Sequence, residues 1–128
     1  MRALIIDDSR GMRSILRRML HQLGFKTEEA ANGREGLERL QQNGAPDLVL
    51  VDWNLPVMNG LEFIQAVRSD RTYDAVPLLM VTTETELSQL SLALESGANE
   101  YMMKPFTQEI LLGKLELLGL PIGGMVHV

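Results

Sequence analysis

The chain of 128 residues has no cysteine and no long apolar segment. The absence of cysteine excludes disulfides and thiolate metal sites. No apolar run approaches the roughly 18 residues that a membrane-spanning helix needs, and the segment after Met1 does not resemble a signal peptide. We therefore expect a cytoplasmic protein that does not associate with a membrane.

Basic residues are also in the minority, because 12 lysines and arginines stand against 17 aspartates and glutamates, for a formal net charge of -5. This balance disfavours direct binding of nucleic acid, since polyanions attract basic surfaces. With 45% hydrophobic residues, the chain is long enough for one domain with a full core. Length and charge together favour a single acidic domain that acts on a protein partner.

Short apolar runs alternate with helical patterns along the whole chain, which is typical of repeating β-α units. Strands are predicted at residues 3–6, 25–30, 48–51, 77–81 and 98–103. Helices are predicted at residues 10–23, 33–42, 61–68, 84–95 and 107–118. Right-handed crossovers between these units predict an α/β fold with a doubly wound parallel sheet of five strands, in which the less apolar second strand lies at an edge.

Amphipathic spacing also predicts which helical side chains face the sheet. The stripes include Ile15 in the first helix, Leu87, Leu90 and Leu94 in the fourth, and Ile110 in the fifth. The first helix should begin after Ser9, which is a favourable N-cap residue. The arginines of that helix are interpreted as a solvated face rather than a docking patch for a kinase; they are Arg10, Arg13, Arg17 and Arg18.

Polar side chains follow four of the predicted strands directly: Asp7 and Asp8, Asp52, Thr82, and Lys104. The carboxyl ends of parallel strands lie at one edge of a sheet, so three carboxylates, a hydroxyl and an ammonium should meet in one crevice. Because the acids repel one another, their clustering predicts a bound cation. A donor set made only of oxygen favours Mg²⁺ or Mn²⁺ over Zn²⁺.

These motifs resemble the receiver domain of two-component response regulators. The resemblance covers residues 2 to about 118 and is carried by Asp7-Asp8, by Asp52 in VDWNLPVMNG, by Thr82 in LLMVTTE and by Lys104 in YMMKPFT. It is strongest to the CheY-like, single-domain chemotaxis type, as indicated by Trp53-Asn54, Glu84 and Tyr101. The resemblance implies a flavodoxin-like (βα)5 three-layer sandwich with strand order 2-1-3-4-5.

For the chemistry, the resemblance implies that Asp52 accepts a phosphoryl group from a phosphohistidine of a sensor histidine kinase. Asp8 would bind Mg²⁺ directly and Asp7 partly through water. Asp52 and the backbone carbonyl of Asn54 would complete the protein ligands. Few protein ligands suit Mg²⁺, which keeps several of its waters.

The resemblance also assigns the remaining roles. Lys104 would pair with one phosphoryl oxygen through a site that includes a cis peptide to Pro105, and Thr82 would donate its hydroxyl to another. Thr82 and Tyr101 would form the switch that changes an output face for a protein target, such as the flagellar motor switch. We expect a monomer that catalyses only its own phosphorylation and dephosphorylation, and so is not an enzyme in the usual sense.

Two features depart from the family pattern. Thr83 is larger than the Ala or Gly often found at its position, which would narrow access to Asp52. The glycine-rich residues 119–128 extend beyond the predicted receiver domain at 1–118 and are interpreted as a C-terminal tail. That tail could be frayed, docked through its apolar residues, or the start of a linker.

Three alternative interpretations compete with this one. The chain could be a receiver domain excised from a larger response regulator or hybrid kinase. A Mg²⁺-dependent phosphatase with an aspartyl nucleophile is the rival from another class, although such enzymes tend to have a D-x-D loop after the first strand, and Asp7 and Asp8 are adjacent. A flavodoxin-like cofactor binder lacks support, because no phosphate-binding loop follows the first strand.

Overall fold

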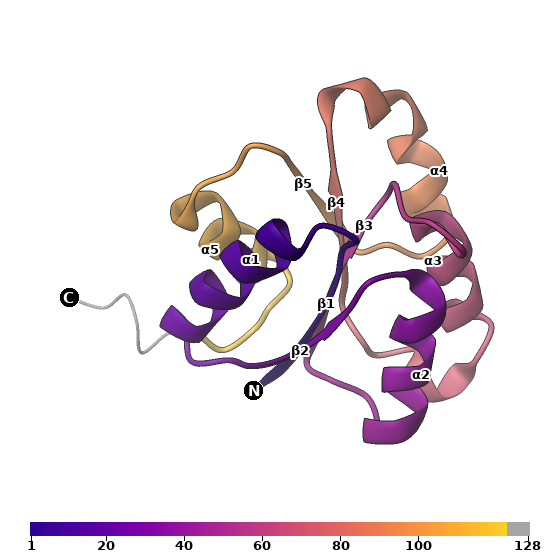
Figure 1. Cartoon of the computed structure of the whole chain (residues 1–128), viewed down its shortest axis with the longest axis horizontal. Helices are drawn as coiled ribbons and strands as arrows, with labels where there is room; N and C mark the ends of the chain where they lie inside the picture. Colours follow the sequence, from indigo (N-terminus) through magenta and orange to yellow (C-terminus); the bar gives the residue numbers. More distant parts are fainter. Residues whose placement is uncertain (123–128) are drawn as a thin grey trace.

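The computed structural model describes residues 1–122, apart from the side chains of Glu84 and Leu87. A parallel five-stranded sheet lies between two layers of helices (Figure 1). Its strands are β1 (Arg2–Ile6), β2 (Lys26–Ala30), β3 (Leu48–Asp52), β4 (Leu78–Thr82) and β5 (Glu100–Met103). The helices are α1 (Arg10–Gln22), α2 (Gly33–Asn43), α3 (Gly60–Arg68), η1 (Arg71–Tyr73), η2 (Glu84–Gln89), α4 (Leu90–Glu95) and α5 (Gln108–Leu117). The order β2-β1-β3-β4-β5 confirms the predicted doubly wound α/β class.

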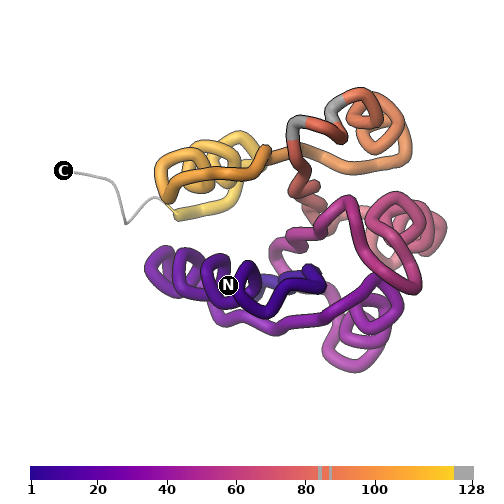
Figure 2. The backbone as a smooth tube through the Cα atoms, turned by 45° about the horizontal axis from the view of Figure 1, so that its top comes forward, coloured from indigo at the N-terminus to yellow at the C-terminus, as the bar shows by residue number. Residues whose placement is uncertain are grey.

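Alternate residues of each strand point to opposite faces of the sheet, so each face has its own core. On one face, Ile6 and Val51 pack with Phe63 of α3 in a cluster that α2 and α4 also join. On the other face, Ile5 packs with Leu16 of α1 in a cluster shared with α5. Figures 1 and 2 show the same division, with α1 and α5 on one side of the sheet and α2, α3 and α4 on the other. Because both faces are covered, the strand ends are where polar chemistry can be exposed.

The loops at the carboxyl ends have one to four residues, except the loop from β3 to α3, which spans residues 53–59. Ser9 caps α1 by accepting a hydrogen bond from the backbone N–H of Met12, as predicted. Asn59 and Glu62 form a capping box at the start of α3. Gly60 lies so close to the end of β3 that a Cβ atom there would clash with the backbone carbonyl of Asp52. Glycine therefore allows α3 to start directly against the strand that carries Asp52.

The segment after β4 differs from the helix predicted at residues 84–95. It begins as the 3-10 helix η2 and becomes α-helical only in α4, so the prediction of one continuous helix is wrong. Polar side chains at its start compete for backbone groups, as when Glu86 accepts a hydrogen bond from the Thr83 N–H. A 3-10 helix has about 3.0 residues per turn, which shifts the apolar stripe. Leu94 is accordingly exposed and Ala93 is buried, whereas the side chain of Leu87 lies outside the described residues.

Two other side chains that were predicted to face the sheet do not do so. Ile15 of α1 and Ile110 of α5 are exposed. In each helix the contact with the sheet is made by neighbouring leucines, Leu16 and Leu20 in α1 and Leu111 and Leu115 in α5. The stripes that bury these helices are therefore narrower than the apolar pattern suggested.

The chain continues to pack on the sheet after α5 ends. Ile122 is buried in the core cluster beneath α1 and α5, and Leu120 packs against that cluster. Up to Ile122 the segment is therefore docked rather than frayed, and the remaining residues of the predicted tail, 123–128, lie outside the described part. None of the helices in the described chain is long and apolar enough to span a bilayer.

Candidate functional site

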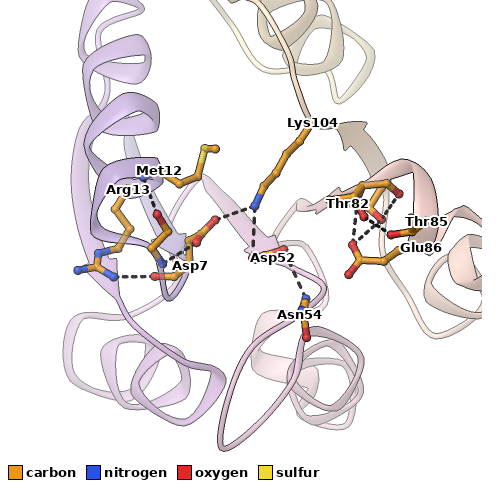
Figure 3. Close-up of polar contacts among 11 residues, drawn as sticks. Asp7, Met12, Arg13, Asp52, Asn54, Thr82, Thr85, Glu86 and Lys104 are labelled. Atoms are coloured by element: carbon orange, nitrogen blue, oxygen red, sulfur yellow. Dashed lines mark hydrogen bonds and ion pairs between the residues drawn. The ribbon is translucent and has the colours of Figure 1, made fainter.

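The carboxyl ends of β1, β3, β4 and β5 bring the predicted polar side chains to one edge of the sheet. Asp52 is the last residue of β3 and pairs in register with Val81, so that Thr82 lies one residue further along β4. Asp7 follows β1 directly, and its backbone N–H donates to the carbonyl of Ala30. Figure 3 shows Lys104 reaching from the end of β5 to a point between Asp7 and Asp52. Parallel topology thus assembles the site from segments far apart in sequence.

Asp52 is a buried carboxylate with few stabilising partners. Only 6% of its surface is exposed. Its Oδ2 lies 3.4 Å from the Nζ of Lys104, and its Oδ1 accepts a long hydrogen bond of 3.4 Å from the Asn54 N–H. Burial and the neighbouring charge of Asp7 raise the pKa of Asp52 to about 6, against the opposing effect of Lys104. The ionised form of Asp52 is therefore less stable, relative to the protonated form, than that of an ordinary aspartate.

Lys104 is the cation that pairs with the acids Asp7 and Asp52. Its Nζ lies 3.3 Å from Oδ2 of Asp7 and 3.4 Å from Oδ2 of Asp52. Burial alone would lower the pKa of Lys104, but the charges of Asp52 and Asp7 outweigh it and raise the pKa above the usual value. Lys104 is thus fully charged at neutral pH, and its peptide bond to Pro105 is cis, as the family resemblance implied.

Three carboxylates at this edge form a set that could hold a metal ion. Asp7, Asp8 and Asp52 each place one oxygen within 4.8 Å of the others'. Asp7 and Asp52 are buried, whereas Asp8 is exposed and so open to solvent. Three negative charges against one ammonium leave an excess that a divalent cation would neutralise. The donors in this set are all carboxylate oxygens, and the predicted binding of Mg²⁺ or Mn²⁺ remains a prediction.

Comparison with known proteins decides the family. The model of the response regulator receiver domain family matches residues 3–116. The chain belongs to this family. The chemotaxis protein CheY1 of Helicobacter pylori is 40% identical over 92% of this chain and 96% of its own length. A CheY homologue of Campylobacter jejuni is 41% identical over 91% of this chain and 90% of its own.

Solved structures of receiver domains agree with this assignment. The chemotaxis response regulator CheY4 of Vibrio cholerae superimposes with a TM-score of 0.84 at 38% identity, covering 91% of this chain and 97% of that one. A response regulator from Chloroflexus aurantiacus gives a TM-score of 0.85 at 30% identity, with 93% and 98% covered. The predicted CheY-like receiver fold is confirmed, and proteins of this type are signalling proteins rather than conventional enzymes.

Within this receiver domain, Thr82 and Asn54 lie at the crevice, and each contacts neighbouring residues. Thr82 is 2% exposed, and its hydroxyl lies within hydrogen-bond distance of two acceptors, a carboxylate oxygen of Glu86 at 3.2 Å and the backbone carbonyl of Thr83 at 3.3 Å (Figure 3). Asn54 contributes its backbone N–H to Asp52. The proposed role of its carbonyl as a metal ligand remains a prediction.

Tyr101 lies away from the acid cluster, on the edge strand β5. Its ring is half-buried against the core beneath α3 and α4, and the Nζ of Lys114 lies 4.2 Å from the ring centroid. Glu100 binds both neighbours, because its Oε1 accepts from Lys114 at 3.0 Å and from the Tyr101 N–H at 3.1 Å. Strand β5 is therefore joined to α5 by a cation-π contact at Tyr101 and an ion pair at Glu100.

Two residues with clear roles at the site were not identified from sequence. Arg13, interpreted as part of a solvated face, donates to the backbone carbonyl of Asp7 at 2.7 Å and pairs with Glu29 at 3.1 Å. Its position five residues after Asp8, on the face of α1 nearest the loop, could have indicated this contact. Glu86 accepts hydrogen bonds from Thr82 and Thr83, and no sequence signal distinguishes it from its neighbouring acids.

Proposed function

We propose that this receiver domain accepts a phosphoryl group on Asp52 and uses it to control binding of a protein target. The observation that carries the proposal is the placement of Asp52: a buried carboxylate beside Lys104, within 4.8 Å of carboxylates of Asp7 and Asp8. Phosphoryl transfer passes through a loose, highly charged transition state, so positioning and cationic charge matter more than a strong base. The site offers both.

In the proposed reaction, a carboxylate oxygen of Asp52 attacks the phosphorus of a phosphohistidine on a sensor kinase. The new O–P bond forms as the N–P bond breaks, and the released imidazole takes up a proton. Hydrolysis by water later regenerates the carboxylate and inorganic phosphate. Lys104 neutralises one phosphoryl oxygen throughout, and the Thr82 hydroxyl can serve another once it is released from its present partners.

A Mg²⁺ ion fits the site's donors. Asp7, Asp8 and Asp52 would hold it, with the Asn54 carbonyl as a further ligand. When bound, the ion supplies positive charge that offsets the acids and the incoming phosphoryl oxygens. Carboxylate and carbonyl oxygens are hard ligands that suit hard cations, so this donor set favours Mg²⁺ or Mn²⁺.

For the biological role, we propose chemotaxis or motility, with a sensor histidine kinase upstream and the flagellar motor switch as the target downstream. The relatives named as chemotaxis proteins support this, because the chain spans at least 90% of the length of each. The predicted receiver domain at 1–118 belongs to the same proposal, and the segment predicted as a tail at 119–128 packs against that domain up to Ile122. The receiver-domain family and the adjacent placement of Asp7 and Asp8 disfavour the phosphatase alternative.

The experiment compares the protein with two variants that differ at opposite ends of β3. Asp52→Asn removes the proposed acceptor, and Asp47→Asn removes an exposed aspartate immediately before the same strand. With acetyl phosphate and Mg²⁺, intact-mass measurement should show one phosphoryl adduct on the parent and on Asp47→Asn, and none on Asp52→Asn. An adduct of equal yield on Asp52→Asn would exclude Asp52 as the acceptor.

A further inference from the structure

The hydroxyl of Thr82 already has an anionic partner. The Oγ1 atom of Thr82 lies 3.2 Å from Oε1 of Glu86. This Oε1 atom also accepts a hydrogen bond from the backbone N–H of Thr83 at 3.0 Å. Two donors at the end of β4 therefore converge on one carboxylate oxygen. Thr82 is almost fully buried, whereas Glu86 is half-buried, so water competes little for the hydroxyl.

This arrangement resembles the contact that a phosphoryl oxygen on Asp52 would need. Both partners are negatively charged oxygens, and a threonine hydroxyl has only one proton to donate. The proton cannot fully serve Glu86 and a phosphoryl group at once. Figure 3 shows Thr82 and Glu86 together on the β4 side of the crevice, joined to one another and not to the Asp52–Lys104 pair.

We infer that Glu86 is a positioning residue that holds Thr82 in the resting conformation and must release it when Asp52 is phosphorylated. The inference rests on the proposed function, which it deepens by naming an internal competitor of the phosphoryl group. Glu86 acts through Thr82 and does not touch the reacting atoms. Its position within the 3-10 helix η2 ties the release of Thr82 to a change in the segment that leads into α4.

The consequence is a resting state stabilised relative to the phosphorylated one. A hydrogen bond makes a typical net contribution that, when lost from only one of two states, shifts the equilibrium between them by about 5-fold to 10-fold. Removing the Glu86 carboxylate should therefore strengthen binding of a phosphoryl analogue by about that factor. Glu86→Gln retains an oxygen acceptor without the charge and should give a smaller gain.

The test measures the affinity for beryllofluoride in saturating Mg²⁺, followed by the fluorescence of Trp53. Four proteins are compared: the parent, Glu86→Ala, Glu86→Gln and Glu95→Ala. Glu95 is an exposed acid at the end of α4, so its removal matches the change in net charge. We expect tighter binding by Glu86→Ala than by Glu86→Gln, and unchanged binding by Glu95→Ala.

A double-mutant cycle with Thr82→Val separates the hydrogen bond from the general effect of charge. If Glu86 acts through Thr82, most of the gain from Glu86→Ala should vanish when Thr82 has no hydroxyl. A gain that persists in full, or an equal gain from Glu95→Ala, overturns the inference. So does an affinity of Glu86→Ala equal to that of the parent.

A readout in the absence of any analogue keeps the two proposals distinguishable. The amide proton of Thr83 should resonate at lower field in the parent than in Glu86→Ala, because it donates to a carboxylate. Failure of every protein to bind beryllofluoride would reject the proposed function and this inference with it. An unchanged Thr83 amide, with normal beryllofluoride binding, would reject the inference alone.

Discussion

The amino ends and the carboxyl ends of the strands lie at opposite edges of the sheet, here called the amino edge and the carboxyl edge. The two edges differ in how many oxygen acceptors surround each positive charge and in whether those acceptors are charged. At the amino edge, the guanidinium of Arg68 donates to four carbonyls and one side-chain amide, those of Tyr73, Asp74, Val76, Gly97 and Asn99. At the carboxyl edge, the single ammonium of Lys104 faces the carboxylates of Asp7 and Asp52, with Asp8 nearby. At the amino edge, neutral oxygens surround the single positive charge of Arg68. At the carboxyl edge, negative charges outnumber the positive charge of Lys104.

The amino edge is complete without any ligand. Asn99 links the network to the sheet, because its Oδ1 accepts from Arg68 and from the backbone N–H of Leu78, each at 2.8 Å. Gly97, with a φ of 119°, leaves room for the side chain of Arg68, which a Cβ atom would meet. Burial lowers the pKa of Arg68, partly offset by the charge of Asp74. The donors are nevertheless satisfied, so this edge stabilises the fold.

The carboxyl edge stabilises the fold less and leaves more for a ligand to do. Burial and the charge of Asp7 raise the pKa of Asp52, which means that ionised Asp52 disfavours the folded state. A cation or phosphoryl group bound there can be stabilised by groups that are already in position. The fold thus separates the edge that stabilises it from the edge at which we propose that ligands bind.

The largest expected effect is the loss of Arg68. Arg68→Met would leave the partly buried carbonyls of Tyr73, Val76 and Gly97 without this donor, and we expect the free energy of unfolding to fall by about 2 to 4 kcal/mol. Arg71→Met, at an exposed position three residues later, should change it by less than about 0.5 kcal/mol. Urea denaturation measures both. A loss below about 1 kcal/mol for Arg68→Met would contradict the view that this edge is a stabilising network.

The next effect has the opposite sign and lies at the other edge. The pKa of Asp52 is about 6 in the folded state and 3.8 for an ordinary aspartate, so the folded state holds more protons between these values. The free energy of unfolding should therefore fall as pH rises through this window, by about 3 kcal/mol in total. Asp52→Asn lacks this titration and should be more stable than the parent at pH 7 by about 2 kcal/mol.

This prediction is checked by urea denaturation from pH 4 to 7 in a chelator, taking the difference between parent and variant so that other acids cancel. Asp47→Asn is the matched control, because Asp47 accepts the Arg2 N–H at the opposite end of β3. That variant should be slightly less stable than the parent. If Asp52→Asn were also less stable than the parent at pH 7, the excess of negative charge at this edge would not destabilise the folded state.

The parts of this molecule that could be predicted from sequence are those fixed by local pattern and topology. The apolar run before Asp52 predicts a buried strand, and parallel strands place Asp7, Asp52, Thr82 and Lys104 at one edge whatever their side chains do. The strand order came instead from the resemblance to receiver domains, because alternation of strands and helices does not determine it. Motifs at strand ends were sufficient to predict the fold and the placement of these side chains at one edge of the sheet.

The parts that could not be predicted depend on side-chain conformation across long sequence separations. Arg68 resembles an ordinary polar residue at the end of a helix, yet its partners lie up to 31 residues away. Glu86 resembles any acid at a helix start, and only the direction of its carboxylate shows that it holds Thr82. The same local competition for backbone donors made η2 a 3-10 helix where the apolar spacing predicted an α-helix.

Mg²⁺ should stabilise the folded protein by mass action, with an effect smaller than those of the substitutions. At ten times the dissociation constant, the free energy of unfolding should rise by about 1.4 kcal/mol. Asp8→Asn should abolish this gain while changing metal-free stability little, because Asp8 is exposed. Thermal melts and Trp53 fluorescence during a Mg²⁺ titration measure both quantities. A parent protein indifferent to millimolar Mg²⁺ by both methods would remove the metal site from the carboxyl edge.

The smallest expected effect concerns the surface formed by α4, β5 and α5, which we propose as the output face centred on Tyr101 and Lys114. A phosphoryl analogue that draws Thr82 and Lys104 inward acts first on the strands that carry them, and packed elements convert small shifts into discrete changes. Amide exchange with and without beryllofluoride should therefore change by about 2-fold to 5-fold within residues 84–117. Residues 69–77, held by Arg68 at the other edge, should not change.

Lys104→Ala provides the control that separates binding from transmission. Asp52 and the proposed Mg²⁺ ligands remain, so this variant should still bind beryllofluoride at a higher concentration, as Trp53 fluorescence can establish. Without the ammonium that joins the acids to β5, exchange at residues 100–117 should stay at its resting rate. Changes confined to residues 10–45 in the parent would place the output face elsewhere. Equal changes in the parent and in Lys104→Ala would instead show that the carboxyl edge transmits its signal without Lys104.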